Sequence, residues 1–166
     1  MNTIPLPFHL FIHFILAISV GYFCGRHFKQ IKLGVIIGFI GGFLIDLDHV
    51  LEYLLFFNWH FDLFEFISGR QFLLSDQIHL WFHAWEYIII LLLGTWIFKK
   101  SKTAQLILFT LALAMSVHIL SDSVINNFPL KYYSLSYRAE MNFAAEKLLS
   151  PQEYLENLEL KRELGY

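Results

Sequence analysis

Three pairs of ionisable residues four positions apart lie within or beside the most apolar stretches of the chain. The pairs are His9 and His13, His79 and His83, and His118 and Asp122. Residues four apart lie on one face of a helix, so each pair can offer two side chains to a single ion. Imidazole nitrogens and carboxylate oxygens are common protein ligands of Zn²⁺ and other divalent cations. The spacing therefore indicates metal coordination.

A fourth group of ionisable residues, Asp46-Leu47-Asp48-His49, interrupts an apolar stretch of the chain. On a regular helix Asp46 and His49 share a face, whereas Asp48 points about 160° away from Asp46. Both aspartates can serve one site only if the turn after the preceding Gly-Gly pair is distorted. If the helix is regular, one aspartate instead supports a ligand from outside the ligand shell.

Four apolar segments are long enough, or nearly so, to cross a hydrocarbon core, which needs about 20 helical residues. They cover approximately residues 6–25, 33–57, 78–98 and 104–122. Only 16% of the residues are charged, against about 25% in soluble domains. We therefore predict an all-α polytopic membrane protein, with a four-helix transmembrane bundle over 1–128 and an interfacial and solvated helical tail over 129–166. In that tail, Ser150, Pro151 and Glu153 predict a capped helix start.

The loops between these segments differ in charge. The first contains Arg26, Lys29 and Lys32, the third contains Lys99, Lys100 and Lys102, and the second contains Arg70 alone. Because cytoplasmic loops carry an excess of lysine and arginine, both termini and the second loop are expected outside the cell. The second loop is rich in aromatic residues, which favours an interfacial location. A net charge of −2 without a basic block argues against a nucleic-acid partner.

The ionisable groups within the four segments share one depth. Counted from the nearest lysine or arginine, they lie roughly 20–30 Å along each helix. A carboxylate at the centre of a membrane helix costs about 2.5–3.5 kcal/mol, and this layer contains no lysine or arginine to neutralise one. We therefore expect a polar layer towards the outer face that is neutralised by one or two divalent cations, with zinc as the first choice.

The expected metal ligands come from all four segments. They are His13, Asp46, His49, His79, His83, His118 and Asp122. Seven ligands exceed the four of one tetrahedral zinc, which favours two ions. Asp48 or Glu86 is expected to act as general base or to hold a ligand histidine in place. His9 is a further ligand candidate, and for His9 and His13 the alternative is an interfacial histidine near a helix start.

The order of these motifs resembles the membrane-bound metal-dependent hydrolase family of bacterial inner-membrane proteins, which is itself similar to zinc-dependent phospholipase C. The resemblance rests on an early histidine, an Asp-x-Asp-His motif, a histidine pair and a His-x-x-x-Asp motif. In this chain these are His13, Asp46 to His49, His79 with His83, and His118 with Asp122. The resemblance implies a hydrolase in the bacterial inner membrane.

We expect a metal-dependent hydrolase that cleaves a phosphoester or ester of a lipid or lipid-linked substrate at the outer membrane face, by metal-activated water. A metal-ion or proton transporter is one alternative, although a transporter needs ionisable groups along its whole path. A non-catalytic protein in which a structural metal joins the helices is another. An open coordination position would distinguish the enzyme from the structural site.

Overall fold

The structure is a computed structural model that describes residues 5–165 of the 166-residue chain. The regular elements in this range are helices, apart from one isolated bridge between Gln77 and Ala144. The helices are α1 (Leu6–His27), α2 (Ile31–Gly42), the 3-10 turn η1 (Leu44–Asp46), α3 (Leu47–Phe56), α4 (Leu63–Ile67), α5 (Arg70–Ser75), α6 (Trp85–Ile97), α7 (Lys102–Ile125), the 3-10 turn η2 (Leu130–Tyr133), α8 (Leu135–Glu140), α9 (Ala145–Leu148) and α10 (Pro151–Glu163). The predicted all-α class is confirmed.

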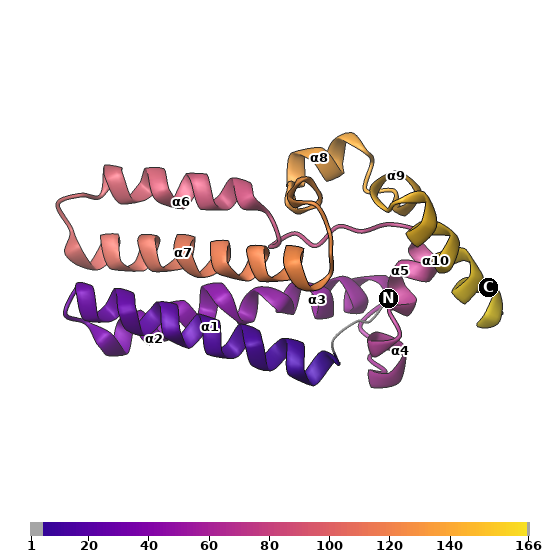
Figure 1. Ribbon diagram of the computed structural model, residues 1–166, viewed down its shortest axis with the longest axis horizontal. Coiled ribbons are helices and arrows are strands. Elements are labelled where there is room, and N and C mark those ends of the chain that lie inside the picture. Colours follow the sequence, from indigo (N-terminus) through magenta and orange to yellow (C-terminus); the bar gives the residue numbers. More distant parts are fainter. Residues whose placement is uncertain (1–4, 166) are drawn as a thin grey trace. The chain divides into compact units, whose positions relative to one another are not determined.

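The chain divides into two compact units that interleave along the sequence. The first unit combines the described residues through Asp46 with His83–Ser134, and the second combines Leu47–Phe82 with the chain from Leu135 onward. The sequence-based division instead placed a boundary near residue 128. The first unit contains α1, α2, α6 and α7, which run alongside one another (Figure 1).

Glycines on α1 and α2 allow the backbones of these two helices to approach each other closely. A Cβ atom added to Gly38 would lie 2.5 Å from the carbonyl oxygen of Ala17, and one added to Gly21 would lie 2.5 Å from that of Gly34. No side chain larger than hydrogen fits at such a contact. The close contact between α1 and α2 therefore depends on glycine at these positions.

Three helical segments of the described chain are long and apolar enough to cross a membrane, namely Leu6–His27, Ile31–Phe56 and Lys102–Ile125. The fourth apolar helix, α6, has only 13 residues. At 1.5 Å per residue it measures roughly 20 Å, less than the hydrocarbon core of about 30 Å. The predicted helix over 78–98 is thus helical only from Trp85 onward.

Side-chain acceptors explain why the chain before α6 is not helical. Two backbone N–H groups, those of His79 and Leu80, donate to the carboxylate of Glu52, and the N–H of Phe82 donates to Asp48. Leu80 also has a positive φ of 44°, which an α-helix does not permit. These donors are satisfied outside a helix, so the histidine pair is not presented on one helical face as the spacing predicted.

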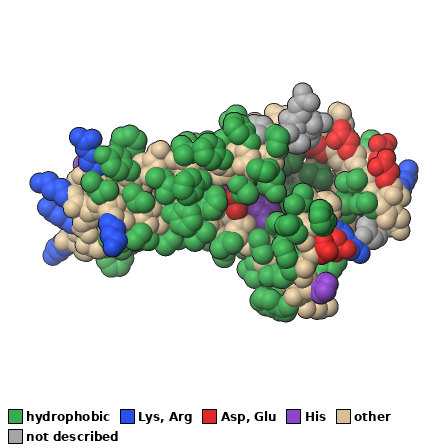
Figure 2. Space-filling view, turned by 90° about the horizontal axis from the view of Figure 1, so that it is seen from below, with side chains coloured by type: hydrophobic (Ala, Val, Ile, Leu, Met, Phe, Trp, Pro, Cys, Tyr) green, Lys and Arg blue, Asp and Glu red, His purple; other side chains and the backbone are tan. Residues whose placement is uncertain are grey.

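Many hydrophobic side chains lie on the face of the first unit that Figure 2 shows. On α1, α6 and α7 large apolar side chains are exposed, including Phe23, Ile90, Trp96 and Val124 at 66, 62, 70 and 81%. Patches of this kind on a soluble monomer would cause association, whereas a bilayer covers them. Lysines and arginines gather at the end of this unit that carries the α1–α2 and α6–α7 loops (Figures 1 and 2).

The helical path breaks between α2 and α3. Helix α2 ends at Gly42, Phe43 has φ −127° and ψ −45°, and a 3-10 turn leads to Asp46 before α3 begins. The turn after Gly41-Gly42 is therefore distorted, which is one of the two alternatives that the sequence allowed. Because of this distortion, the Asp46 side chain does not point in the direction that a regular helix would give it.

The second unit is built from short helices around a buried tyrosine. Tyr53 is fully buried among Phe57, Phe61 and Phe66, and its hydroxyl donates to Glu65. The tail contributes an ion pair of 2.7 Å between Lys161 Nζ of α10 and Asp76 Oδ2. The predicted capped start of α10 is present as a capping box between Ser150 and Glu153.

Candidate metal centre

Four buried or half-buried side chains of the first unit converge on one point. His118 and Asp122 lie one turn apart on α7, Asp46 ends η1, and His83 lies two residues before α6. His83 and His118 are each 1% exposed and Asp122 is 4% exposed. Three separate segments thus bring two imidazoles and two carboxylates into the interior.

The distances among these four side chains match a tetrahedral ligand shell. The Nε2 atoms of His83 and His118 are 3.0 Å apart. They lie 3.3 and 3.4 Å from Asp46 Oδ1, and 3.5 and 3.2 Å from Asp122 Oδ2. Zinc bonds of about 2.0–2.1 Å in a tetrahedron place neighbouring ligand atoms roughly 3.3–3.4 Å apart. The cluster therefore has the size that one zinc-like cation requires.

The hydrogen bond on the other side of His118 fixes its tautomer and makes Nε2 available as a ligand. Nδ1 lies 3.0 Å from the carbonyl oxygen of Gly42, which can only accept, so Nδ1 carries the hydrogen. In the neutral ring Nε2 then presents a lone pair towards Asp46 and Asp122. Acceptors that face one another in the interior need a cation or added protons between them. Asp46 Oδ2 is also buried without a hydrogen-bond partner in the described part of the chain.

A second group shares Asp122 with the first. Asp122 Oδ1 lies 2.9 Å from His9 Nε2 and 2.9 Å from His13 Nε2. The His13 contact is not in hydrogen-bond geometry, although the two atoms are close. Asp122 thus directs Oδ1 to the histidines of α1 and Oδ2 to His83 and His118.

Ser121 orients His13 as Gly42 orients His118. Its hydroxyl donates to the carbonyl oxygen of His118 at 2.8 Å, so its oxygen accepts from His13 Nδ1 at 3.3 Å. The hydrogen on Nδ1 leaves Nε2 of His13 with a lone pair on the side of Asp122. In the second group His9 Nε2 is hydrogen-bonded to Asp122 Oδ1. His9, His13 and Asp122 are three residues that could hold a metal ion, which is the count of sites that keep one position open for water or substrate.

Small residues bring the segments of the centre together. A Cβ atom on Gly42 would lie 2.9 Å from the Cβ of Ala17 and 3.3 Å from the Cβ of Ala114. The end of α2 therefore contacts both α1 and α7 at close range. This approach places the Gly42 carbonyl against His118.

Within the first unit, the structure brings together five of the seven residues expected as ligands. They are His13, Asp46, His83, His118 and Asp122, and His9 joins them. His49 and His79 belong to the second unit, where His49 packs edge-to-face on Phe72 and His79 Nδ1 lies 2.9 Å from Glu52 Oε1. The i,i+4 spacing signalled His9, whereas Glu52 has no signal beyond being an acid within an apolar run.

The two residues expected to act as general base lie in different units. Asp48 is fully buried in the second unit and accepts the N–H of Phe82 at 2.8 Å. Glu86 lies in the first turn of α6, in the first unit, and accepts from the hydroxyl of Ser134 at 2.6 Å. Both carboxylates therefore have a hydrogen-bond donor that holds them in place.

The chain was compared with family models, curated proteins and solved structures. None matches it. The resemblance to membrane-bound metal-dependent hydrolases thus stays a prediction. What the structure shows is a membrane-type helical protein with buried histidine and aspartate groups that could hold a metal ion.

Proposed function

We propose that this protein is an integral membrane hydrolase with four membrane crossings, the fourth made by α6 and the residues before it. Two divalent cations would lie between the helices, joined by Asp122. The substrate would be a phosphoester or ester of a lipid or lipid-linked compound. The single observation that carries the proposal is that the two oxygens of Asp122 contact different histidine pairs. Oδ1 lies beside His9 and His13, and Oδ2 lies beside His83 and His118.

Each part of the ligand set has a separate task in this proposal. Asp46, His83, His118 and Asp122 would form a closed shell around one cation, whereas His9, His13 and Asp122 would leave a position for water or a substrate oxygen. When bound, such cations polarise a substrate oxygen and make water acidic enough to lose a proton near neutral pH. The Gly42 carbonyl and the Ser121 hydroxyl hold the ligand histidines in one tautomer.

A carboxylate is needed to accept the proton of the attacking water. Glu86 is the first candidate because it lies in the same unit as the centre. Its contact with Ser134 would keep the side chain in one orientation. Asp48 is the second candidate, with the alternative task of shaping the segment before α6 through the Phe82 N–H.

The location follows from the charge of the loops. We place the α1–α2 and α6–α7 loops in the cytoplasm, because six of the seven lysines and arginines of the first unit lie in or beside them. The termini and the metal centre would then lie towards the outer face of a bacterial inner membrane. A centre near that boundary can be reached by a lipid headgroup.

The decisive experiment combines metal analysis with a hydrolysis assay on purified full-length protein. We expect about two zinc-like ions per chain for the wild type and fewer than one for Asp122→Ala, because both groups lose a ligand. His60→Ala, which changes an exposed loop histidine, should retain both. Release of phosphate or fatty acid from lipid substrates should require the metal and should be lost in Asp122→Ala. A metal-loaded wild type that cleaves no lipid ester or phosphoester would contradict the hydrolase.

The second candidate function is a structural metal site. It is favoured because Asp46, His83, His118 and Asp122 can supply all four ligands of a tetrahedral zinc. In that case chelation would unfold the protein, and no lipid would be cleaved at any metal content. The two outcomes differ in the hydrolysis assay and agree in the metal analysis.

A further inference from the structure

The second unit contains a pocket of about 560 Å³ that the proposed metal centre does not use. Its lining includes Glu52, Leu55, Gln71, Leu74, His79 and Trp81. This volume lies within the range of about 300–1,000 Å³ that is usual for small-molecule sites. We call this feature the Glu52 pocket.

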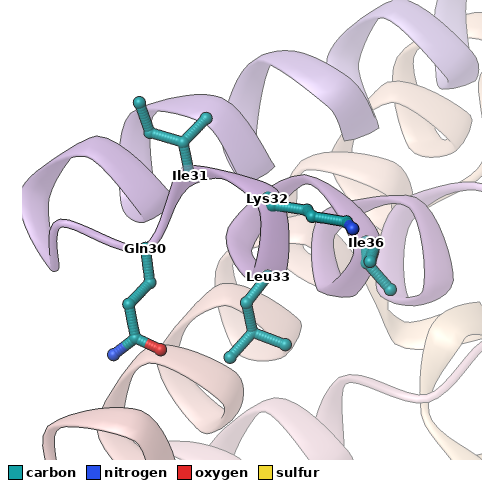
Figure 3. Close-up of a pocket in the computed structure, with 5 residues that line it drawn as sticks. All are labelled: Gln30, Ile31, Lys32, Leu33 and Ile36. Atoms are coloured by element: carbon teal, nitrogen blue, oxygen red, sulfur yellow. The ribbon is translucent and has the colours of Figure 1, made fainter.

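A hollow of about 440 Å³ at the start of α2 provides a contrast. Its residues come from one continuous stretch, Gln30 to Ile36, and their side chains diverge (Figure 3). Polar groups that point apart cannot surround a ligand. The Glu52 pocket differs because its polar residues come from α3, from α5 and from the segment that follows α5.

Glu52 holds His79 in one orientation and one tautomer. Its Oε1 accepts from the backbone N–H of His79 at 2.9 Å and lies 2.9 Å from the ring Nδ1, while Oε2 accepts from the N–H of Leu80 at 3.2 Å. The carboxylate next to Nδ1 requires a hydrogen there, so in the neutral ring Nε2 is an acceptor. The ring stacks on Trp81 and packs against Phe143, with centroids 5.3 and 4.7 Å away.

Gln71 supplies a second acceptor. Its side chain is 2% exposed, and Oε1 is buried without a hydrogen-bond partner in residues 5–165. A buried acceptor that lacks a donor is unfavourable, and a ligand that donates a hydrogen bond removes this cost. The lining, as far as the chain is described, contains Glu52 but neither lysine nor arginine.

We propose that the Glu52 pocket binds the headgroup of an uncharged lipid with free hydroxyl groups, such as a monoacylglycerol. One hydroxyl donates to His79 Nε2 and another to Gln71 Oε1, and the start of the acyl chain lies against Leu55 and Leu74. A phosphate would face the Glu52 carboxylate in a lining whose described residues include neither lysine nor arginine. The amine headgroups of membrane phospholipids also carry a phosphate, so they are disfavoured for the same reason. The site is independent of any bound metal.

The test measures lipid binding to the full-length protein by native mass spectrometry. The detergent is lauryldimethylamine oxide, because sugar detergents present hydroxyls that would occupy the pocket. We expect one 1-monooleoylglycerol per chain, bound about tenfold more tightly than 1-oleoyl lysophosphatidate, which differs by a phosphate. Equal binding of the two lipids would overturn the proposal.

Two variants remove one acceptor each. His79→Asn keeps an N–H for Glu52 but lacks Nε2, and Gln71→Met keeps the side-chain length but lacks Oε1. Each should weaken monooleoylglycerol binding about tenfold, the effect of one lost hydrogen bond. His60→Ala, an exposed histidine of the same unit outside the lining, should bind as the wild type does. Wild-type affinity in both pocket variants would overturn the proposal.

Asp122→Ala separates this site from the proposed metal centre. The variant should lose metal and still bind monooleoylglycerol with wild-type affinity, whereas His79→Asn should keep its metal and bind the lipid weakly. Loss of lipid binding in metal-free Asp122→Ala would overturn the independence of the pocket. Failure of the hydrolysis assay alone leaves these binding results unchanged.

Discussion

At the scale of single residues, the contacts of Asp122 and its neighbour Ser121 decide how the centre can work. Asp122 contacts imidazoles through both oxygens, and Ser121 fixes the ring of His13 by accepting from Nδ1. Partners of this kind orient a ligand without touching the metal, and their loss commonly lowers metal affinity. Ser121 is therefore a positioning residue whose effect can be measured apart from that of the ligands.

Ser121→Ala should weaken metal binding at the three-ligand group by about 10–100-fold, because the His13 ring loses the partner that sets its tautomer. Competition with a chromophoric zinc chelator measures this affinity. Ser116→Ala is the matched control, since Ser116 lies on the same helix and donates only to the carbonyl oxygen of Ala112. Equal affinities in the two variants would show that Ser121 does not orient a ligand.

At the scale of elements, the contact between α1 and α2 depends on glycine. Their backbones meet at Gly21 and Gly38, and the same pair of helices carries His13 and leads to Asp46. A change in the spacing of α1 and α2 would move ligands from both groups. The contact thus affects both the stability of the first unit and the geometry of the centre.

Gly38→Ala should lower the free energy of unfolding by about 1–3 kcal/mol, because its Cβ would meet the Ala17 backbone and force the helices apart. Denaturation in mixed detergent micelles, followed by circular dichroism, measures the change. Gly94→Ala on α6 is the control. Its Cβ would meet the flexible side chain of Leu108, whose nearest methyl group lies at 3.2 Å, and alanine favours a helix over glycine by about 1 kcal/mol. A Gly38→Ala protein as stable as Gly94→Ala would contradict the close contact.

At the scale of the whole molecule, the hydrophobic surface and the basic loops predict how the protein lies in a membrane. Cysteines placed in exposed loops can report this orientation, in a Cys24→Ser background. Ser101→Cys should be protected from a membrane-impermeant maleimide in spheroplasts, because the α6–α7 loop is expected in the cytoplasm. His60→Cys should be labelled. The reverse pattern would show that the centre faces the cytoplasm.

Metal binding should also contribute to the stability of the whole protein. A ligand that binds only the folded state at 100 times its dissociation constant stabilises it by about 2.7 kcal/mol. Zinc added after chelation should therefore raise the thermal midpoint of the wild type and leave that of Asp122→Ala unchanged.

Acid should reduce this stabilisation. Histidine ligates metal only in its neutral form, so protons compete with the metal for the ligand nitrogens. The metal-dependent increase in the thermal midpoint should be present at pH 7.5 and absent at pH 5. An increase of the same size at pH 5 would argue against histidine ligands.

Local sequence was sufficient to predict the helical class, the apolar segments and the capped start of α10. It also predicted that His118 and Asp122 share a face, since these properties depend on residues within one or two turns. The sequence also identified a set of histidines and carboxylates able to bind a cation.

Only the tertiary structure decided which of these candidate ligands lie close together. Glu52 and Asp48 take the backbone donors of His79, Leu80 and Phe82, so the chain before α6 is not a helix. His79 then belongs to a pocket of the second unit while His83 reaches the centre. These hydrogen bonds join residues about thirty positions apart, and hydropathy and helical periodicity carry no information over that separation. For the same reason the sharing of Asp122 between two groups could be seen only once α1, α6 and α7 were packed together.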